Sequence, residues 1–151
     1  MTTAVRDFSF SATTTMPYQR ALSILREALK RHAFEVLCEL PLDRELERKV
    51  GLQCQHCTVF VIWSPFDAYQ AVISDRDGGV LVPFNLTVAE YGSSTVYAAT
   101  NHAALSRNGG SIGVQVLVQT LTKKVRRLFL ELAMHETVPE YRETQGSAVG
   151  R

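Results

Sequence analysis

Residues 58–63 read Thr-Val-Phe-Val-Ile-Trp, an almost unbroken apolar run that is rich in β-branched side chains. A run of this length and composition predicts a central strand, buried on both faces of a sheet. Ser64, Pro65 and Asp67 follow at once, and a serine, a proline and an acid in this order favour the start of a helix. The buried face of that helix is expected to consist of Ala68, Tyr69, Val72 and Ile73.

Two strands and two helices are expected before this run. Residues 8–12 and 34–40 alternate between apolar and other side chains, which predicts a strand in each. A helix is expected to begin near Pro17, because apolar residues then recur at helical spacing. A shorter helix is expected from Asp43 to Gly51, with the aspartate as its cap and the glycine as its stop. The apolar stripe of the longer helix is formed by Ala21, Leu22, Leu25, Ala28 and Leu29.

The chain after the central run predicts a hairpin and a long helix. Val80–Glu90 is expected to form a fourth strand, and Pro83 limits its early part to an edge or a bulge. A turn then leads into a fifth strand at Thr95–Thr100. Residues 101–111 are expected to form a loop, and the apolar stripe from Val114 to Leu132 predicts the terminal helix.

These elements follow the order β-α-β-(α)-β-α-β-β-α and predict an α+β fold. The most economical arrangement is a single mixed or antiparallel five-stranded sheet, with two long helices and one shorter helix packed mainly on one face. The other face of such a sheet has no helical cover. Residues 1–151 are expected to form a single domain, in which residues 140–151 are a disordered tail.

Charge and composition exclude several classes of protein. The 16 basic and 15 acidic residues leave a net charge of only +1, whereas nucleic-acid binders usually show a marked basic excess. No segment reaches the roughly 20 apolar residues of a membrane span. The first 16 residues have no apolar core typical of a signal peptide, and three cysteines do not indicate a disulfide framework. We therefore expect a cytoplasmic protein with neither a nucleic-acid nor a membrane partner.

Three stretches resemble a bacterial domain-of-unknown-function family, number 302. Residues 33–36, Ala-Phe-Glu-Val, resemble its Gly-Phe-x-Val stretch. Ser-Pro at 64–65 and Ala-Tyr-Gln-Ala at 68–71 resemble its Asn-Pro-x-x-Ala-Tyr-x-Ala helix. Residues 75–85, with Gly-Val-Leu-Val-Pro at 79–83, resemble its Asp-Pro-x-x-Gly-Leu-Leu-Leu-Pro-Cys stretch, which is the most specific of the three.

The resemblance covers roughly residues 8–100 and has three departures. Phe84 replaces the usual cysteine, Ser64 replaces asparagine and Ala33 replaces glycine. A role that depends on the family cysteine is therefore absent from this chain. The resemblance implies a compact α+β domain that forms a homodimer, and it implies no reaction.

The motif Cys54-Gln55-His56-Cys57 is a candidate thiol or metal site. Redox motifs of this type place the first cysteine at the start of a helix, which lowers the pKa of its thiol, but here a strand follows. A structural zinc site needs four ligands. The spacings of Cys38, His32 and His102 match no known zinc motif. We therefore expect neither a metal nor another cofactor, although Cys54, His56 and Cys57 remain the residues of an alternative enzyme.

Two further features have ordinary explanations. Lys123, Lys124, Arg126 and Arg127 form a basic cluster that is expected on the solvated face of the last helix. The helix start at 64–67 offers free amides to an anion, but Asp67 already supplies a negative charge there.

The sequence favours a non-enzymatic homodimer that binds a small molecule or a partner. Its ligand site is expected where the central strand ends and the Pro83 strand begins, because strand ends beside helix starts commonly hold pockets. The alternatives are a thiol- or metal-dependent enzyme and a nucleic-acid accessory protein that uses Lys123–Arg127. The predicted ligand residues are Trp63, Ser64, Tyr69, Pro83, Phe84 and Asn85.

Overall fold

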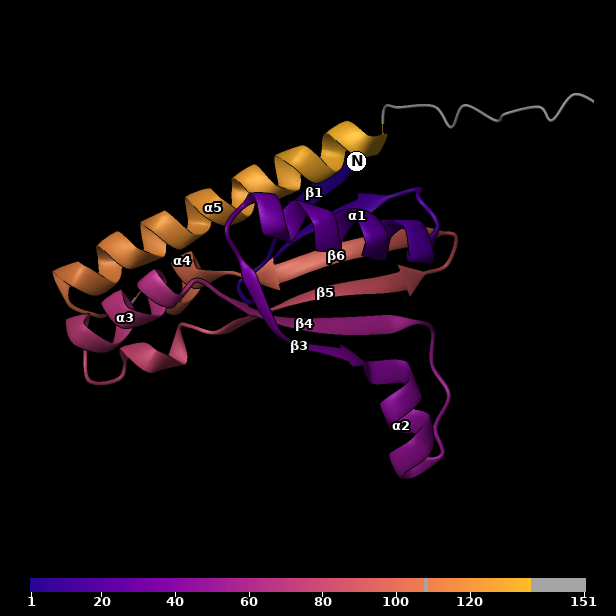
Figure 1. The fold of residues 1–151 in the computed structure, drawn as a ribbon, viewed down its shortest axis with the longest axis horizontal. Coiled ribbons are helices and arrows are strands. Elements are labelled where there is room, and N and C mark those ends of the chain that lie inside the picture. The colour runs from indigo at the N-terminus through magenta and orange to yellow at the C-terminus, as the bar shows by residue number, and fades with distance from the viewer. Residues whose placement is uncertain (108, 137–151) are drawn as a thin grey trace, which may run out of the picture.

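The computed structural model describes residues 1–107 and 109–136, so the predicted tail at 140–151 lies outside the described residues. In this part of the chain, six strands form one antiparallel sheet in the order β1-β2-β6-β5-β4-β3 (Figure 1). The strands are β1 (Thr2–Val5), β2 (Ser9–Thr14), β3 (Glu35–Pro41), β4 (Cys57–Trp63), β5 (Phe84–Tyr91) and β6 (Ser94–Thr100). The helices are α1 (Tyr18–Arg31), α2 (Leu42–Val50), α3 (Pro65–Ser74), the 3₁₀ helix η1 (Gly78–Val80), α4 (His102–Leu105) and α5 (Ile112–Glu136).

The α+β class and the single sheet are confirmed, but the number of strands was predicted wrongly. The sheet gains β1, which pairs with β2 in a register that places Thr3 opposite Ala12. The four residues of β1 are all exposed, so they carry no alternation between apolar and polar positions. A strand of this kind is stabilised by its partner strand and leaves almost no signal in its own sequence.

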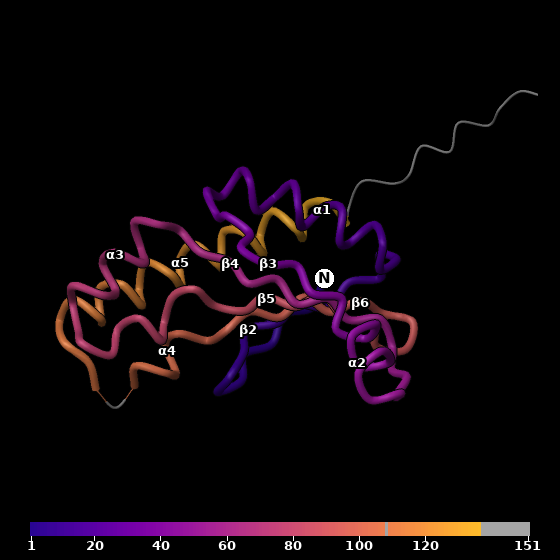
Figure 2. Tube along the Cα trace, turned by 60° about the horizontal axis from the view of Figure 1, so that its bottom comes forward, coloured from indigo at the N-terminus to yellow at the C-terminus, as the bar shows by residue number. Residues whose placement is uncertain are grey.

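Helices α1 and α5 lie on the same side of the sheet (Figure 2). Their apolar stripes meet the alternate residues of the strands that face them, including Phe60 and Ile62 on β4 and Leu86 and Val88 on β5. The opposite side of the sheet, here called the open face, has no helix over its centre in Figure 2. The core therefore lies between the sheet and the two long helices.

The expected burial of both faces of residues 58–63 is wrong. The strand β4 alternates, with Thr58, Phe60 and Ile62 buried and Val59 and Val61 only half-buried. The latter two belong to the open face, because Val59 is opposite Thr87 and Val61 is opposite Asn85. An apolar run on both faces is typical of a parallel sheet, whereas this strand lies in an antiparallel sheet with a single helical layer.

The expected buried face of α3 is also wrong. Tyr69, Val72 and Ile73 are exposed, and only Asp67 and Ala71 are buried. The helix starts at Pro65 as predicted, but the Ser64 hydroxyl makes no capping hydrogen bond. The apolar pattern of α3 is thus turned toward solvent in a single copy of the chain.

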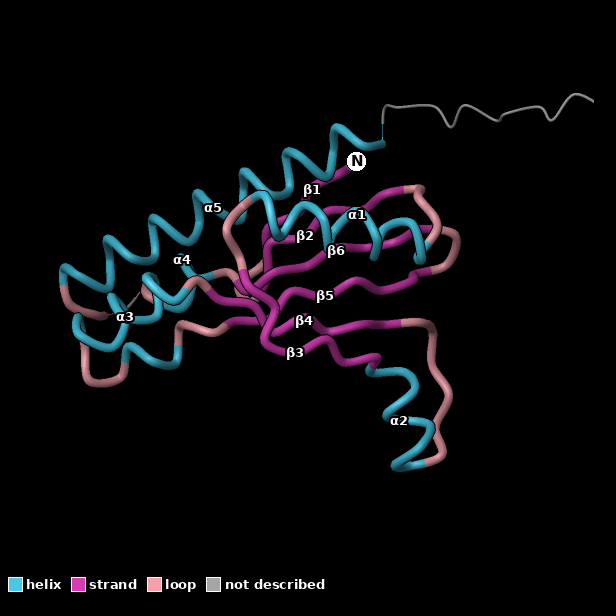
Figure 3. The backbone as a smooth tube through the Cα atoms, viewed as in Figure 1, coloured by secondary structure: helices cyan, strands magenta, loops and turns pink. Residues whose placement is uncertain are grey.

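Two element boundaries differ from those that the sequence predicted, and a third agrees. The strand predicted at Val80–Glu90 corresponds to β5. It begins only at Phe84, because the preceding residues form η1 and a short buried segment. Within the predicted loop 101–111, residues 102–105 form α4, and the Asn101 side chain caps it by accepting a hydrogen bond from the Ala104 N–H. The helix α2 ends where predicted, because Gly51 takes the left-handed conformation at φ 67°. Figure 3 shows α2 extending away from the sheet.

Candidate functional site

A cavity of about 230 Å³ lies where α1 begins, β3 ends, α2 begins and β4 begins. Three stretches that are distant in the sequence, 18–26, 39–44 and 56–58, meet there because β3 and β4 are adjacent in the sheet and Tyr18 at the start of α1 contacts Thr58 on β4. The cavity is lined by Tyr18, Gln19, Leu22, Arg26, Glu39, Pro41, Asp43, Arg44, His56 and Thr58. We call it the His56 cavity.

One wall of the His56 cavity is aromatic and hydrogen-bonded. The Tyr18 hydroxyl and the Thr58 hydroxyl lie 2.6 Å apart in a buried hydrogen bond. The rings of Tyr18 and His56 are stacked, with centroids 5.3 Å apart and an interplanar angle of 16°. Burial raises the pKa of Tyr18, and the hydrogen bond to Thr58 only partly offsets this effect. The phenol is therefore neutral at physiological pH and acts through its hydroxyl dipole and its ring.

The same His56 also forms a pair with an aspartate of the cavity lining. His56 Nδ1 lies 3.0 Å from one carboxylate oxygen of Asp43, and the backbone N–H of Cys57 donates to the other at 3.3 Å. Burial alone would raise the pKa of Asp43, but the hydrogen bonds from His56 and Cys57 outweigh it and lower the pKa. The ionised Asp43 thereby fixes the orientation of the imidazole. The Nε2 atom of His56 has no hydrogen-bond partner in the described part of the chain.

Two arginines line the same cavity in different states. Arg26 donates from Nε and Nη2 to the carboxylate of Glu39, and this interaction raises the pKa of Arg26. Arg44, on α2, forms neither a hydrogen bond nor an ion pair within residues 1–107 and 109–136. It is exposed, and it lines the cavity beside Asp43. Arg44 is thus the cationic group of the cavity that is available to a ligand.

The Cys-x-x-Cys motif lies beside this cavity and not within it. Cys54 is exposed and Cys57 is half-buried, and both are free thiols. Burial raises the pKa of Cys57, with further contributions from the charges of Asp43 and Cys54. A raised pKa disfavours the thiolate, which is the reactive form of cysteine. Within the described residues, no cluster of three or more His, Cys, Asp or Glu side chains has a geometry suited to a metal ion.

The six predicted ligand residues are divided between two sides of the sheet. Phe84 and Ser64 are buried, and the Phe84 ring contacts Phe34 edge-on at 5.9 Å. Asn85 belongs to the open face, as does Trp63, whose indole N–H donates to Glu35 at 3.1 Å. Tyr69 and Pro83 are exposed, and none of the six lines the His56 cavity. Binding at these residues stays a prediction.

The basic cluster on α5 is not uniformly solvated. Lys123, Arg126 and Arg127 are exposed, whereas Lys124 forms an ion pair with the buried Asp67. The acid at the start of α3 therefore neutralises a lysine of α5, and this ion pair links the two helices.

Sequence patterns missed most of the His56 cavity. Tyr18, Arg44 and Thr58 carried no motif, and Asp43 was predicted only as a helix cap. The structure places Pro41 at the N-cap and directs the Asp43 carboxylate to His56 and Cys57. Only His56 was singled out beforehand, and its partners were not.

Comparison with known proteins identifies the family. Residues 10–132 match the family described as "Domain of unknown function DUF302". The crystal structure of an uncharacterized conserved DUF302 protein from Bacillus stearothermophilus is similar, with a TM-score of 0.75 and 17% sequence identity. The similarity covers 83% of this chain and 98% of that one, and at this identity it concerns the fold alone.

No curated protein matches the chain. No helix among residues 1–107 and 109–136 is long and apolar enough to cross a membrane. The family match spans most of the sequence, including α1, all of α5 except its last four residues, and all strands except β1 and the start of β2. The chain therefore belongs to the DUF302 family of domains of unknown function.

Proposed function

We propose that the protein is a non-enzymatic homodimer that binds a small molecule with one acidic group in the His56 cavity. The observation that carries this proposal is the cluster formed by His56, Asp43 and Tyr18 beside the unpaired Arg44. A structural role alone does not require a guanidinium and an imidazole nitrogen without partners beside one cavity. The volume of about 230 Å³ favours a ligand smaller than most drug-sized molecules.

The chemistry of the lining residues supports an acidic ligand. Glu39 is paired with Arg26, and the Asp43 carboxylate is hydrogen-bonded to His56 and to the Cys57 backbone N–H, so both acids of the cavity have partners. Arg44 remains, and a guanidinium matches the fork geometry of a carboxylate or a phosphate. With Asp43 on Nδ1, His56 presents Nε2 as a second polar contact, and Tyr18 supports one side of the imidazole.

The homodimer in this proposal is supported by apolar surface that one copy leaves in solvent. The open face of the sheet has the half-buried Val59 and Val61 on β4, and the helix α3 exposes four large apolar side chains. Contiguous apolar patches of this kind mark interaction sites in soluble proteins. Light scattering after gel filtration is expected to report about twice the chain mass of 16.8 kDa.

The binding proposal is tested by titrating the protein with benzoate and with inorganic phosphate while NMR signals of the His56 side chain are followed. Arg44→Gln and His56→Gln are each expected to weaken binding by about tenfold or more, because each removes a charge-assisted or polar contact. Arg48→Gln is the matched control. Arg48 lies on the same helix, pairs with Glu45 and does not line the cavity.

Two results would contradict the binding proposal. The first is that neither probe shifts the His56 signals, while a co-purified ligand seen by native mass spectrometry is unaffected by both cavity substitutions. The second is that Asn85→Ala weakens binding and the cavity substitutions do not. The ligand would then bind at the strand ends that the sequence predicted. The alternative of a thiol- or metal-dependent enzyme predicts instead that Cys54→Ser and Cys57→Ser abolish an activity.

A further inference from the structure

The helix α3 has its polar and apolar faces reversed relative to an ordinary surface helix. One of its two buried residues carries a charge, Asp67, which is 3% exposed. An ordinary surface helix turns an apolar stripe inward and keeps charges in water. The residues on the outer face, which we call the α3 face, are Phe66, Tyr69, Val72 and Ile73, with exposed fractions of 69%, 61%, 65% and 57%.

This reversal follows from how α3 is held. Its start is fixed by the ion pair of Asp67 with Lys124, and its end by the Ser111 hydroxyl, which donates to the Ser74 carbonyl at 2.7 Å. Between these points α3 and α5 run antiparallel and very close, since a Cβ at Gly113 would meet Ser74 Oγ at 2.6 Å. Polar groups and a glycine thus make the contact with α5, and the large apolar residues are left outside.

The size of this surface is comparable with that of a protein interface. An aromatic side chain offers about 150–250 Å². The two exposed rings, Phe66 and Tyr69, therefore leave on the order of 100–150 Å² each in solvent. The same lobe of the molecule also exposes Val80, Leu105, Ile112 and Val116. The four residues of the α3 face by themselves leave on the order of several hundred Å² in solvent, a large part of the roughly 800 Å² that each partner of a standard interface buries.

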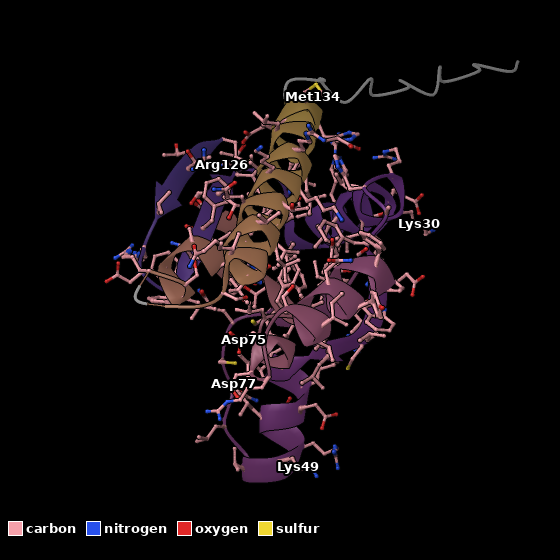
Figure 4. All side chains as sticks on the ribbon, turned by 90° about the vertical axis from the view of Figure 1, so that its left-hand side faces the viewer. Lys30, Lys49, Asp75, Asp77, Arg126 and Met134 are labelled. Carbon is pink, nitrogen blue, oxygen red and sulfur yellow. The ribbon has the colours of Figure 1, made fainter. Side chains whose placement is uncertain are left out.

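Charge is distributed unevenly along α3. Its C-terminal end is followed by Asp75 and Asp77, which Figure 4 shows close together and well separated from Arg126. Arg76 lies between them and pairs with Asp77 at 3.4 Å, so this end keeps a net charge of −1. Its N-terminal end lies beside Lys124 of α5, so the exposed Lys123 and Arg127 are within one turn of that end. The helix dipole adds to this asymmetry, with partial positive charge at the N-terminus and partial negative charge at the C-terminus.

A surface with a basic end, an apolar middle and an acidic end is complementary to a second copy of itself that is related by a two-fold axis. Two-fold dimers use one patch twice, so each residue meets the other half of the same patch. With α3 antiparallel to α3 of a second copy, the acidic end of each helix faces the basic end of the other. The spacing of Phe66, Tyr69 and Ile73 is the three-and-four spacing of helices that pack side by side.

We propose that the α3 faces of two copies of this chain pack antiparallel about a two-fold axis, and that this contact forms the interface of the homodimer. The inference rests on the homodimer proposed above and states which surface of the chain forms the contact between its two copies. The open face of the sheet is the weaker candidate, because Val59, Val61 and Trp63 are only half-buried there, and none of them is among the strongly exposed apolar residues.

The test compares two substitutions that place a charge on one surface or the other. Ile73→Glu lies on the α3 face, and Thr87→Glu lies at the centre of the open face, opposite Val59 and Ala98. We expect Ile73→Glu to raise the dimer dissociation constant by about 100-fold or more, and Thr87→Glu to leave it unchanged. Light scattering over a concentration series gives the constant, and circular dichroism melts confirm that each variant folds.

The antiparallel orientation has its own test by charge exchange. Asp77→Lys and Lys123→Asp are each expected to weaken the dimer by about three- to tenfold, because each places like charges at the facing ends. The double variant Asp77→Lys/Lys123→Asp is expected to recover most of the loss, since it restores opposite charges. A double variant that is weaker than both single variants would overturn the antiparallel arrangement.

The outcomes separate failure of the interface from failure of the homodimer. A wild-type dimer that Thr87→Glu dissociates and Ile73→Glu does not would overturn the α3 interface while leaving the homodimer in place. A wild-type protein that remains monomeric at every concentration would overturn both. Binding in the His56 cavity is measured independently, because the cavity is at the Cys57 end of β4 and α3 follows its Trp63 end, about 20 Å away.

Discussion

The carboxylate of Asp67, near the start of α3, forms an ion pair of 2.5 Å with the ammonium group of Lys124 on α5. The side chain of Asp67 is almost fully buried, while 30% of the Lys124 side chain stays in solvent. A buried carboxylate that loses its partner keeps the full cost of its desolvation. This pair therefore holds α3 against α5 and sets which face of α3 is exposed.

We expect Lys124→Ala to lower the free energy of unfolding by about 2–3 kcal/mol. The loss is somewhat smaller than for a fully buried pair, because Lys124 is partly solvated. Urea denaturation followed by circular dichroism measures it. Arg126→Ala on the same helix is the matched control, with an expected change within about 0.5 kcal/mol at this exposed site. Equal losses in the two variants would show that the ion pair does not stabilise the fold.

Stability is expected to fall in acid partly through Asp43. The hydrogen bonds from His56 and Cys57 lower the pKa of Asp43 in the folded state, although burial opposes them. A lowered pKa gives stability that is present above the unfolded value of about 3.9 and is lost as pH falls through the folded value. Asp43→Asn is therefore expected to flatten the acid limb of the stability curve below about pH 4. Unfolding midpoints in urea between pH 2 and pH 7 measure this, and an unchanged acid limb would contradict it.

The hydroxyl of Tyr18 is expected to stabilise the His56 cavity. Tyr18→Phe keeps the stacking on His56 but removes the 2.6 Å hydrogen bond and leaves the buried Thr58 hydroxyl without this partner. The expected loss is about 1–2 kcal/mol in the free energy of unfolding. Tyr91→Phe is the control, because Tyr91 is exposed at the end of β5. A neutral Tyr18→Phe variant would mean that this hydrogen bond contributes no net stability.

The two thiols of the Cys-x-x-Cys motif are expected to react at different rates. Burial and the nearby Asp43 raise the pKa of Cys57, whereas Cys54 is exposed. Because the thiolate is the reactive form, iodoacetamide at pH 7.5 is expected to modify Cys54 first. Peptide mapping by mass spectrometry gives the order of modification. Faster modification of Cys57 would favour the thiol-dependent alternative over the binding function.

Local patterns determined the elements whose signals lie within a few neighbouring residues. The stripe from Ala21 to Leu29 predicted α1, the apolar run at 58–63 predicted β4, and the turn after β5 predicted the β5–β6 hairpin. Periodicity reports on one element at a time, so these predictions did not depend on the rest of the fold. The strand β1 was missed because its signal lies in its partner β2.

The sequence by itself determined the α+β class, the single sheet, most element positions and the family resemblance. The tertiary structure alone decided which faces are covered. It turned the apolar side of α3 outward, because the polar contacts of Asp67 and Ser74 with α5 fix the rotation of the helix. It also brought Tyr18 to Thr58, which is 40 residues away, and both to His56. Such contacts depend on strand order and helix packing, and no local pattern in the sequence encodes either.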